Sequence, residues 1–271
     1  ASDVYKRQLI DKASSLVESI IPKRTREEEK RALREGLNRT AKMGWTQLHD
    51  AGSPLSDYEI LNELKKNEGL PVRIQFYVSD GEDGNKFLDE GPYLDPDHFL
   101  TSRGIKFYAD GAIGSRGAAF FDKYDDYETK GFLIFQKEET IPKLVKALVN
   151  GIQIQTHAIG DLANKITLDW YEEAFNKVSP ENRIIENPRW RVEHAQNIKP
   201  EDQQRYSDLE VIASMQPSHA IGDLHFAHKR LGEERLKDAY TWKKLIELGV
   251  VVVGGSDAPV EIGDPRIEFK A

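Results

Sequence analysis

The sequence predicts an α/β protein, and three observations lead to this class. Segments with a helical spacing of apolar residues alternate with short β-rich runs along the chain, without internal repeats. The 271 residues suit one or two domains, and a hydrophobic fraction of 39% is enough for a sizeable core. Repeated strand–helix units imply parallel strands joined by right-handed crossovers. A doubly wound sheet and a barrel both fit this pattern.

Local signals give the order of the elements. Thr25 and Glu28 form a capping-box pattern that predicts the start of a helix, and Ser56 and Glu59 form a second one. A loop rich in Gly, Asp and Pro is expected to reach about residue 102. Residues 111–135 form a long loop, of a length typical of functional lids or disordered segments. Helices are predicted at residues 9–21, 25–43, 56–69, 138–149, 161–178, 200–207 and 223–248. Strands are predicted at residues 45–49, 72–78, 105–109, 152–157, 189–195, 211–216 and 250–254.

The composition excludes several classes of protein. The net charge of −8 argues against nucleic acid or an anionic membrane surface as the main partner, since both require a cationic face. The absence of cysteine excludes a disulfide scaffold, thiolate zinc sites and cysteine nucleophiles. No apolar run is long enough for a membrane span and no signal peptide is evident, so we expect a cytoplasmic protein. We interpret residues 1–8 as a non-native tail, because SDVYKRQ resembles a sequence often seen at the ends of assembled environmental sequences.

Polar residues stand at the carboxyl ends of several predicted strands. Ile152 and Ile154 share one face of their strand, whereas His157 lies on the other face, which in a barrel is the mouth of the lumen. His194 ends the next strand and Asp257 follows the last one. Taken singly, such a His is more often a hydrogen-bonded structural residue and such an Asp a helix N-cap. Together they predict a site for zinc or a similar divalent ion.

Lys106 is unusual because it lies inside the predicted strand 105–109. An unpaired ammonium that faces the interior costs several kcal/mol. One interpretation is a lysine on an edge strand that extends its charged end to solvent. The other is a lysine that has reacted with carbon dioxide and forms a carbamate able to bridge two metal ions.

Six segments resemble the YtcJ-like group of amidohydrolase family 3, in the family's order and over nearly all of the chain from about residue 30. They are residues 44–52 (GWTQLHDAG), 105–119 (IKFYADGAIGSRGAA), 156–161 (THAIGD), 191–196 (RVEHAQ), 213–220 (ASMQPSHA) and 255–261 (GSDAPVE). The resemblance implies a metal-dependent (β/α)8 barrel with a small β-sandwich built from both chain ends. It also implies hydrolysis of a non-peptide C–N bond in an amide-like or formamide-like small molecule.

The resemblance also implies roles for individual residues. Lys106 would be the carboxylated lysine that bridges two ions, and His157 and His194 would be metal ligands. Asp257 would be both a ligand and the general acid–base residue. The implied cofactor is a divalent metal, zinc, as one or two ions that activate a hydroxide for attack on the substrate carbonyl.

Four further residues have two open interpretations. Gln216 and His219 follow the strand 211–216 and either contact substrate or form a structural turn. Asp110 and Arg116 flank or lie in the long loop and either bind substrate or are simply solvated. The expected partners are therefore a small amide-like substrate and a second copy of the chain in a homo-oligomer, with no nucleic acid or membrane.

The sequence departs from the family at one point. The family's first strand carries a His-x-His pair, and no such pair occurs in these 271 residues. We therefore interpret residues 9–271 as a partial barrel domain, from the family's second strand to its eighth, without the β-sandwich. This internal fragment is expected to be inactive by itself and to expose unpaired edges. The alternative function is a catalytically inactive pseudoenzyme barrel that only binds.

Overall fold

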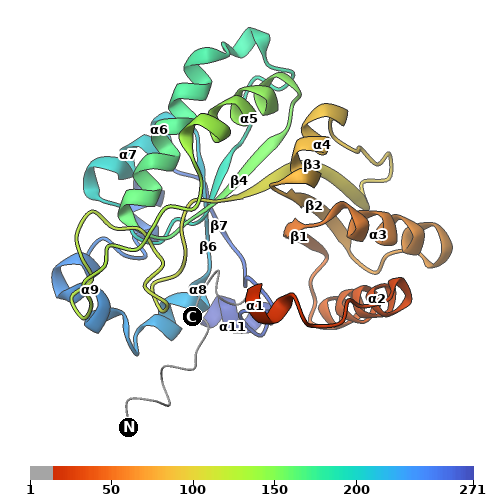
Figure 1. The fold of residues 1–271 in the computed structure, drawn as a ribbon, viewed down its shortest axis with the longest axis horizontal. Coiled ribbons are helices and arrows are strands. Elements are labelled where there is room, and N and C mark those ends of the chain that lie inside the picture. The colour runs from red at the N-terminus through yellow and green to blue at the C-terminus, as the bar shows by residue number, and fades with distance from the viewer. Residues whose placement is uncertain (1–14) are drawn as a thin grey trace.

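The computed structural model describes residues 15–271 and contains one parallel sheet of seven strands (Figure 1). Each strand pairs with its neighbour in the sequence, so the order in the sheet is β1 to β7. The strands are β1 (Gln47–Ser53), β2 (Arg73–Ser79), β3 (Leu100–Tyr108), β4 (Gln153–Ala158), β5 (Arg191–His194), β6 (Ile212–Met215) and β7 (Val252–Gly254). Each of the seven overlaps a strand predicted from the sequence, which confirms the α/β class.

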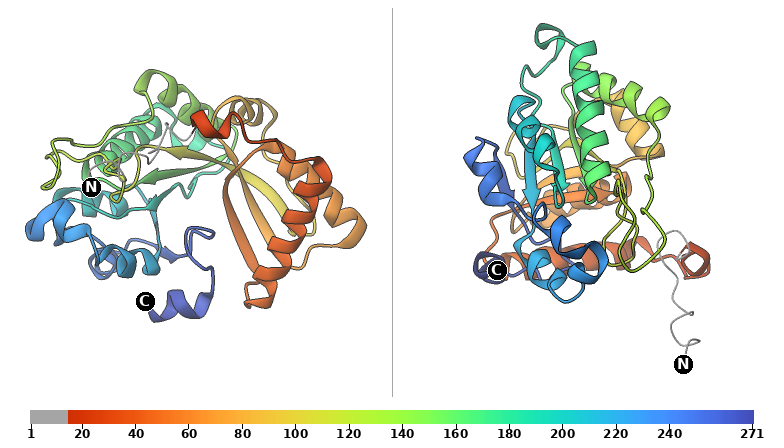
Figure 2. Two further views of the ribbon diagram at one scale, coloured as in Figure 1. Left: turned by 60° about the horizontal axis from the view of Figure 1, so that its bottom comes forward. Right: turned by 90° about the vertical axis from the view of Figure 1, so that its left-hand side faces the viewer.

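Helices cover the outside of the curled sheet (Figures 1 and 2). They are α1 (Ser15–Glu18), α2 (Arg26–Lys42), α3 (Leu55–Glu68), α4 (Glu82–Glu90), α5 (Lys137–Val149), α6 (Asp161–Lys177), α7 (Pro200–Asp208), α8 (Pro217–Asp223), α9 (Ala227–Leu236), α10 (Trp242–Glu247) and α11 (Pro265–Lys270), with a 3-10 turn at Pro180–Asn182. Within residues 15–271, no helix combines the length and the apolar character needed to cross a membrane. The arrangement is an incomplete barrel of the (β/α)8 type.

The hydrophobic core lies between the sheet and the helices. Ile154 on β4, Val192 on β5 and Ala213 on β6 have no exposed surface and belong to one apolar cluster. The alternate positions carry polar side chains such as Lys106 and Gln155, which are paired across β3 and β4. The strand pattern predicted from the sequence is therefore present: apolar residues meet the helices and polar residues face the concave inner side, which we call the lumen.

The sheet is open, because β1 and β7 each pair with only one strand. Two hydrogen bonds nevertheless connect the two ends of the sheet. The indole Nε1 of Trp45 donates to Gly263 O at 2.6 Å, and Arg39 Nη2 donates to Ile262 O at 3.3 Å. The segment after β7 is therefore held against the region that precedes β1.

Three predictions about helices need correction, whereas the capping box of Thr25 and Glu28 at α2 is confirmed. Helix α4 lies in a stretch predicted as loop; it has only nine residues, and Phe87 and Leu88 are its only apolar side chains among Gly, Asn and charged residues. The second capping box is wrong, since α3 begins at Leu55 and Asp83 accepts from the Leu55 N–H. The predicted helix 223–248 is interrupted, and Gly232 has a φ of 69° inside α9.

The long loop, residues 111–135, is ordered and packs on α9 beside the carboxyl ends of the strands (Figure 1). A second apolar cluster joins it to the rest of the chain through Phe120, Ile159 and Leu231. Asp126 forms ion pairs with both Arg116 and Arg230. We call residues 111–135 the cap loop.

Candidate metal centre

The carboxyl ends of β4 to β7 bring several ionisable side chains to one edge of the sheet. His157 lies near the end of β4 and His194 ends β5. His219 lies in α8, which directly follows β6, and Asp257 follows β7. Parallel strands place their carboxyl ends at the same edge, so residues far apart in sequence become neighbours there.

His194, His219 and Asp257 form the tightest group. One potential ligand atom from each lies within 4.8 Å of the others. His219 Nε2 is 3.8 Å from Asp257 Oδ2 and has no hydrogen-bond partner among the described residues, although it is buried. Two imidazoles and a carboxylate that point at a common volume are a donor set that fits a divalent ion such as zinc.

His157 lies beside this group. Its ring centroid is 4.5 Å from that of His194, in an edge-to-face arrangement. Its Nε2 faces Gly111 O at 3.3 Å and Asp110 Oδ1 at 3.5 Å. The structure thus brings His157, His194 and Asp257 to one place. His219, predicted from the sequence as a substrate contact at the same mouth, lies in the same group of potential ligands.

Burial keeps both strand-end histidines neutral. It lowers the pKa of His194 to about 4, against an opposing effect of the Asp257 carboxylate. Burial also lowers the pKa of His157 well below its ordinary value, and the nearby His194 and Lys106 add to this shift. A neutral imidazole has a lone pair to offer, which is the state that metal coordination requires.

Gln216, at the same mouth, contacts His194. Its side chain is buried, and its Oε1 lies 2.8 Å from His194 Nδ1. Its Nε2 donates to Ser214 O, which fixes the orientation of the amide. His194 Nδ1 therefore donates to Gln216, and Nε2 keeps the free lone pair.

Lys106 is buried, with 4% of its surface exposed, in the interior strand β3. Its place in the sheet excludes the edge-strand interpretation. Its Nζ lies 4.4 Å from the centre of the Tyr108 ring, and none of the described carboxylates within residues 15–271 forms an ion pair with it. Burial lowers its pKa, although Glu193 and Asp257 act in the opposite direction. The Gln155 amide opposite Lys106 is also buried, and neither of its polar atoms has a hydrogen-bond partner within residues 15–271.

A polar network lies around Arg191, on the lumen side of β5. Arg191 Nε donates to Glu193 Oε1 at 2.6 Å, and its Nη1 lies 3.0 Å from His49 Nδ1. Burial alone would raise the pKa of Glu193, but Arg191, Ser214 and Lys106 together outweigh it and the net pKa is lowered. Glu193 is therefore an anion whose hydrogen-bonded partner is Arg191, and it acts on Lys106 only through its charge.

Asp110 and Arg116 both have polar partners within the protein. Asp110 is 1% exposed and accepts three backbone N–H groups, and burial raises its pKa to about 7. Arg116 binds Asp126 at 2.8 and 3.0 Å and lies over the Tyr127 ring. Sequence reasoning also missed Glu261, whose Oε1 lies 3.8 Å from His219 Nε2. The only signal for it was its place at the end of the GSDAPVE segment.

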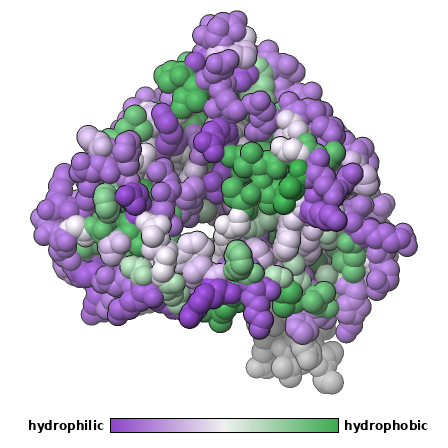
Figure 3. Space-filling model, turned by 180° about the vertical axis from the view of Figure 1, so that it is seen from behind, coloured by the Kyte–Doolittle hydropathy of each residue, from purple (hydrophilic) through white to green (hydrophobic). Residues whose placement is uncertain are grey.

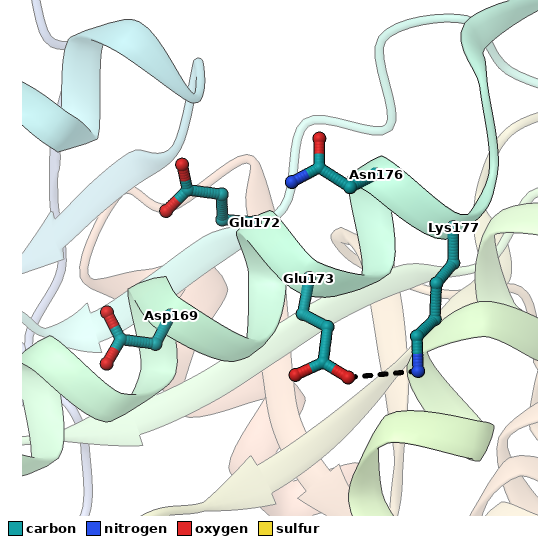
Figure 4. A pocket seen from close by; sticks show the side chains of 5 residues that line it. All are labelled: Asp169, Glu172, Glu173, Asn176 and Lys177. Atoms are coloured by element: carbon teal, nitrogen blue, oxygen red, sulfur yellow. Dashed lines mark ion pairs between the residues drawn. The ribbon is translucent and has the colours of Figure 1, made fainter.

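A shallow hollow of about 450 Å³ lies elsewhere, on the outer surface of α6 (Figure 4). It is lined by Asp169, Glu172, Glu173, Asn176 and Lys177. Lys177 pairs with Glu173 at 2.9 Å, as the figure shows. Its charged groups lie on a solvated helix face with ion pairs of their own, so it is separate from the candidate centre.

The sequence matches the model of the amidohydrolase family over residues 5–271. It is 30% identical to "Putative amidohydrolase YtcJ" of Bacillus subtilis (strain 168), over 97% of this chain and 49% of that protein. It is 35% identical to "Protein LONG AFTER FAR-RED 3" of Arabidopsis thaliana, over 64% of this chain and 29% of that protein. The chain therefore spans half or less of the length of these relatives.

Two solved structures resemble the fold closely. An uncharacterized metal-dependent hydrolase from Pyrococcus horikoshii OT3 has a TM-score of 0.82 at 26% identity, over 95% of this chain and 50% of that one. An uncharacterized metal-dependent hydrolase from Pyrococcus furiosus has a TM-score of 0.79 at 25% identity, over 95% and 52% of the two chains.

Proposed function

Because this chain belongs to the amidohydrolase family, we propose that its strand-end residues are part of the centre of a metal-dependent hydrolase that cleaves non-peptide C–N bonds in small amide-like molecules. One observation carries the proposal: His194, His219 and Asp257 offer ligand atoms within 4.8 Å of one another. The neutral His157 ring lies beside them. The unpartnered His219 Nε2 further supports the fit of a cation to this group.

The proposal assigns a role to each of these residues. His194, His219 and Asp257 would hold the ion, with His157 beside them as a further ligand, and Gln216 would keep His194 in the tautomer that binds metal. A divalent ion such as zinc, held there, would activate a water molecule for attack and polarise the carbonyl of the substrate. Asp257, whose side chain is 37% exposed, accepts a proton at the mouth and delivers it to the leaving nitrogen.

Lys106 has a separate role in this proposal. Burial lowers the pKa of Lys106, so its amine loses its proton more readily than the amine of an exposed lysine. The amine nitrogen forms a bond to carbon dioxide and loses a proton, which gives a carbamate with two oxygens for metal binding. In this chain, which has no His-x-His pair, we expect Lys106 to stay unmodified and the site to hold one ion at most.

A binding-only barrel is the second candidate, and the missing His-x-His pair favours it for the chain as it stands. Metal analysis and hydrolysis of a formamide panel, on this chain and on a full-length version, separate the two. The hydrolase proposal expects one zinc ion per chain, loss of zinc in His194→Gln, and hydrolysis by the full-length protein. His228→Gln on α9 is the control and should retain zinc. Absence of zinc binding and of hydrolysis in the full-length protein would leave only the binding role.

A further inference from the structure

Asp110 connects the cap loop to the strand-end site. It follows β3 by two residues, and its Oδ2 accepts from the N–H groups of Ala119 and Gly160, each at 2.8 Å. Its Oδ1 accepts from the Ile159 N–H at 3.0 Å. Ala119 belongs to the cap loop, whereas Ile159 and Gly160 form the turn after β4. One buried carboxylate therefore holds the loop against the turn that begins two residues after His157.

The remaining lone pair of Asp110 Oδ1 is close to His157. The distance from Oδ1 to His157 Nε2 is 3.5 Å, and Gly111 O lies 3.3 Å from the same nitrogen. Above the Asp110 pKa of about 7, two acceptors and no donor of the described residues face Nε2, so this nitrogen carries the proton of the neutral ring. His157 Nδ1 is left with the free lone pair.

We propose that Asp110 is a positioning residue for His157, which holds the ring as its Nε2–H tautomer and so assigns Nδ1 to the metal. The assignment of a metal rests on the proposed function, but the tautomer itself does not. Metal-binding histidines commonly donate their other N–H to a carboxylate or a backbone carbonyl, and loss of such a partner typically weakens binding by ten- to a hundredfold. The same contacts make Asp110 the link between cap loop and metal site.

Asp110→Asn should reverse the preference of His157 for the Nε2–H tautomer. Asn has one acceptor oxygen, and two backbone N–H groups claim it at the Oδ2 position. The amide NH2 then takes the Oδ1 position, where it can no longer accept from the Ile159 N–H and turns a donor toward His157 Nε2. That nitrogen becomes a better acceptor than donor, so the Nδ1–H tautomer gains population.

Asp161 offers a matched control. It is also a buried carboxylate that anchors the cap loop, because its Oδ1 accepts from the Phe121 N–H at 2.9 Å. No contact joins it to His157 in the described part of the chain. A purely structural effect of loosening the loop should therefore appear in Asp161→Asn as well as in Asp110→Asn.

The test is long-range 1H–15N NMR of histidine rings in the metal-free 271-residue chain at pH 8.5, with the His157 signals assigned by their loss in His157→Gln. We expect the Nε2–H tautomer in the wild type and in Asp161→Asn, and a shift toward Nδ1–H in Asp110→Asn. A wild-type Nδ1–H tautomer, or equal shifts in the two variants, would overturn the proposal. The wild-type spectrum decides this even if Asp110→Asn does not fold.

Zinc alone serves as the second probe. Competition with a chromogenic chelator should show binding weakened at least about tenfold in Asp110→Asn and by much less in Asp161→Asn. Equal weakening in both variants would contradict a positioning role. If the wild type binds no zinc while the tautomers behave as expected, the proposed function fails and the positioning of His157 stands.

Discussion

Burial sets the protonation state of the histidines at the strand ends. His194 is 7% exposed, and burial lowers its pKa from the ordinary value near 6.5 to about 4. The folded protein binds a proton there only near pH 4, whereas the unfolded chain does so near pH 6.5. Between these values the unfolded state takes up a proton that the folded state does not, so acid favours unfolding.

This predicts a pH-dependent difference between the wild type and His194→Gln. The wild type should lose stability more steeply than the variant as pH falls from 6.5 to 4, by up to about 1.4 kcal/mol per pH unit. Urea unfolding at a series of pH values measures both curves, and their difference cancels the other titrating groups. A difference that stays constant over this range would contradict a neutral, buried His194.

Lys106 gives a second prediction at this scale, for a full-length protein that carries this segment. Lys106→Ala should abolish most of the hydrolase activity and lower the metal content. Bicarbonate with a short carboxylic acid should restore part of the activity, because it replaces the lost carbamate. Lys165→Ala on α6, where the lysine pairs with Asp169, is the control and should behave as the wild type. Full activity in Lys106→Ala would exclude the proposed role.

The sequence could indicate which residues meet, but not what each one touches. His157, His194 and Asp257 each stand at a strand end, and parallel topology alone brings such residues to one edge. His219 is different, because it reaches the group only through the turn of α8 after β6. The contacts of Gln216 depend on side-chain orientation, which no spacing rule encodes.

At the scale of elements, the cap loop shows how little freedom a long loop can have. Its backbone passes close to the start of α6, at Gly160. A Cβ at Gly160 would lie 1.9 Å from Ala119 O, and the backbone oxygen cannot move aside without moving the loop. The predicted lid-like loop is therefore packed and anchored rather than free, which its length alone could not reveal.

Gly160→Ala should accordingly destabilise the protein by about 1–3 kcal/mol and release the cap loop. Gly222→Ala in α8 is the matched control, since nothing lies within 4 Å of its added Cβ. Urea unfolding measures the stability, and limited proteolysis within residues 111–135 reports on the loop. A Gly160→Ala variant as stable and as resistant as the wild type would contradict this close packing.

Elements with strong periodic or alternating patterns were predictable, and those without were not. The seven strands follow from runs of β-branched and aromatic residues between helical segments. Helix α4 was hidden by its Gly and Asp residues and by its shortness. The start of α3 was predicted at the wrong residue because the carboxylate that accepts from its first N–H group, that of Asp83, belongs to helix α4.

At the scale of the whole molecule, the open sheet leaves two edges, at β1 and β7. The surface seen from behind is mostly hydrophilic with separate apolar patches (Figure 3). Val251, directly before β7, is 56% exposed. Unpaired backbone groups beside an exposed apolar residue favour association with another chain.

We therefore expect this chain to associate with itself as its concentration rises, as measured by sedimentation velocity. Val251→Lys should reduce the association, because a charged residue at an edge opposes pairing. Ile184→Lys replaces a side chain that is 70% exposed and lies away from the edges, so it should have little effect. A wild-type chain that stays monomeric and unfolds cooperatively would argue against a partial barrel.

The pairing of each strand with its neighbour in sequence has a consequence for how the chain is made. A sheet ordered from β1 to β7 can grow in the direction of synthesis. When a new strand leaves the ribosome, the preceding strand, which is its partner, has already emerged. Contacts between neighbouring strands close shorter loops than contacts between the two ends of the sheet, so they cost less loop-closure entropy. The bonds from Trp45 to Gly263 and from Arg39 to Ile262 span more than two hundred residues, so they form only after β7 has emerged. During translation each strand can therefore pair soon after it emerges, whereas the contacts of Arg39 and Trp45 with residues 262–263 form last.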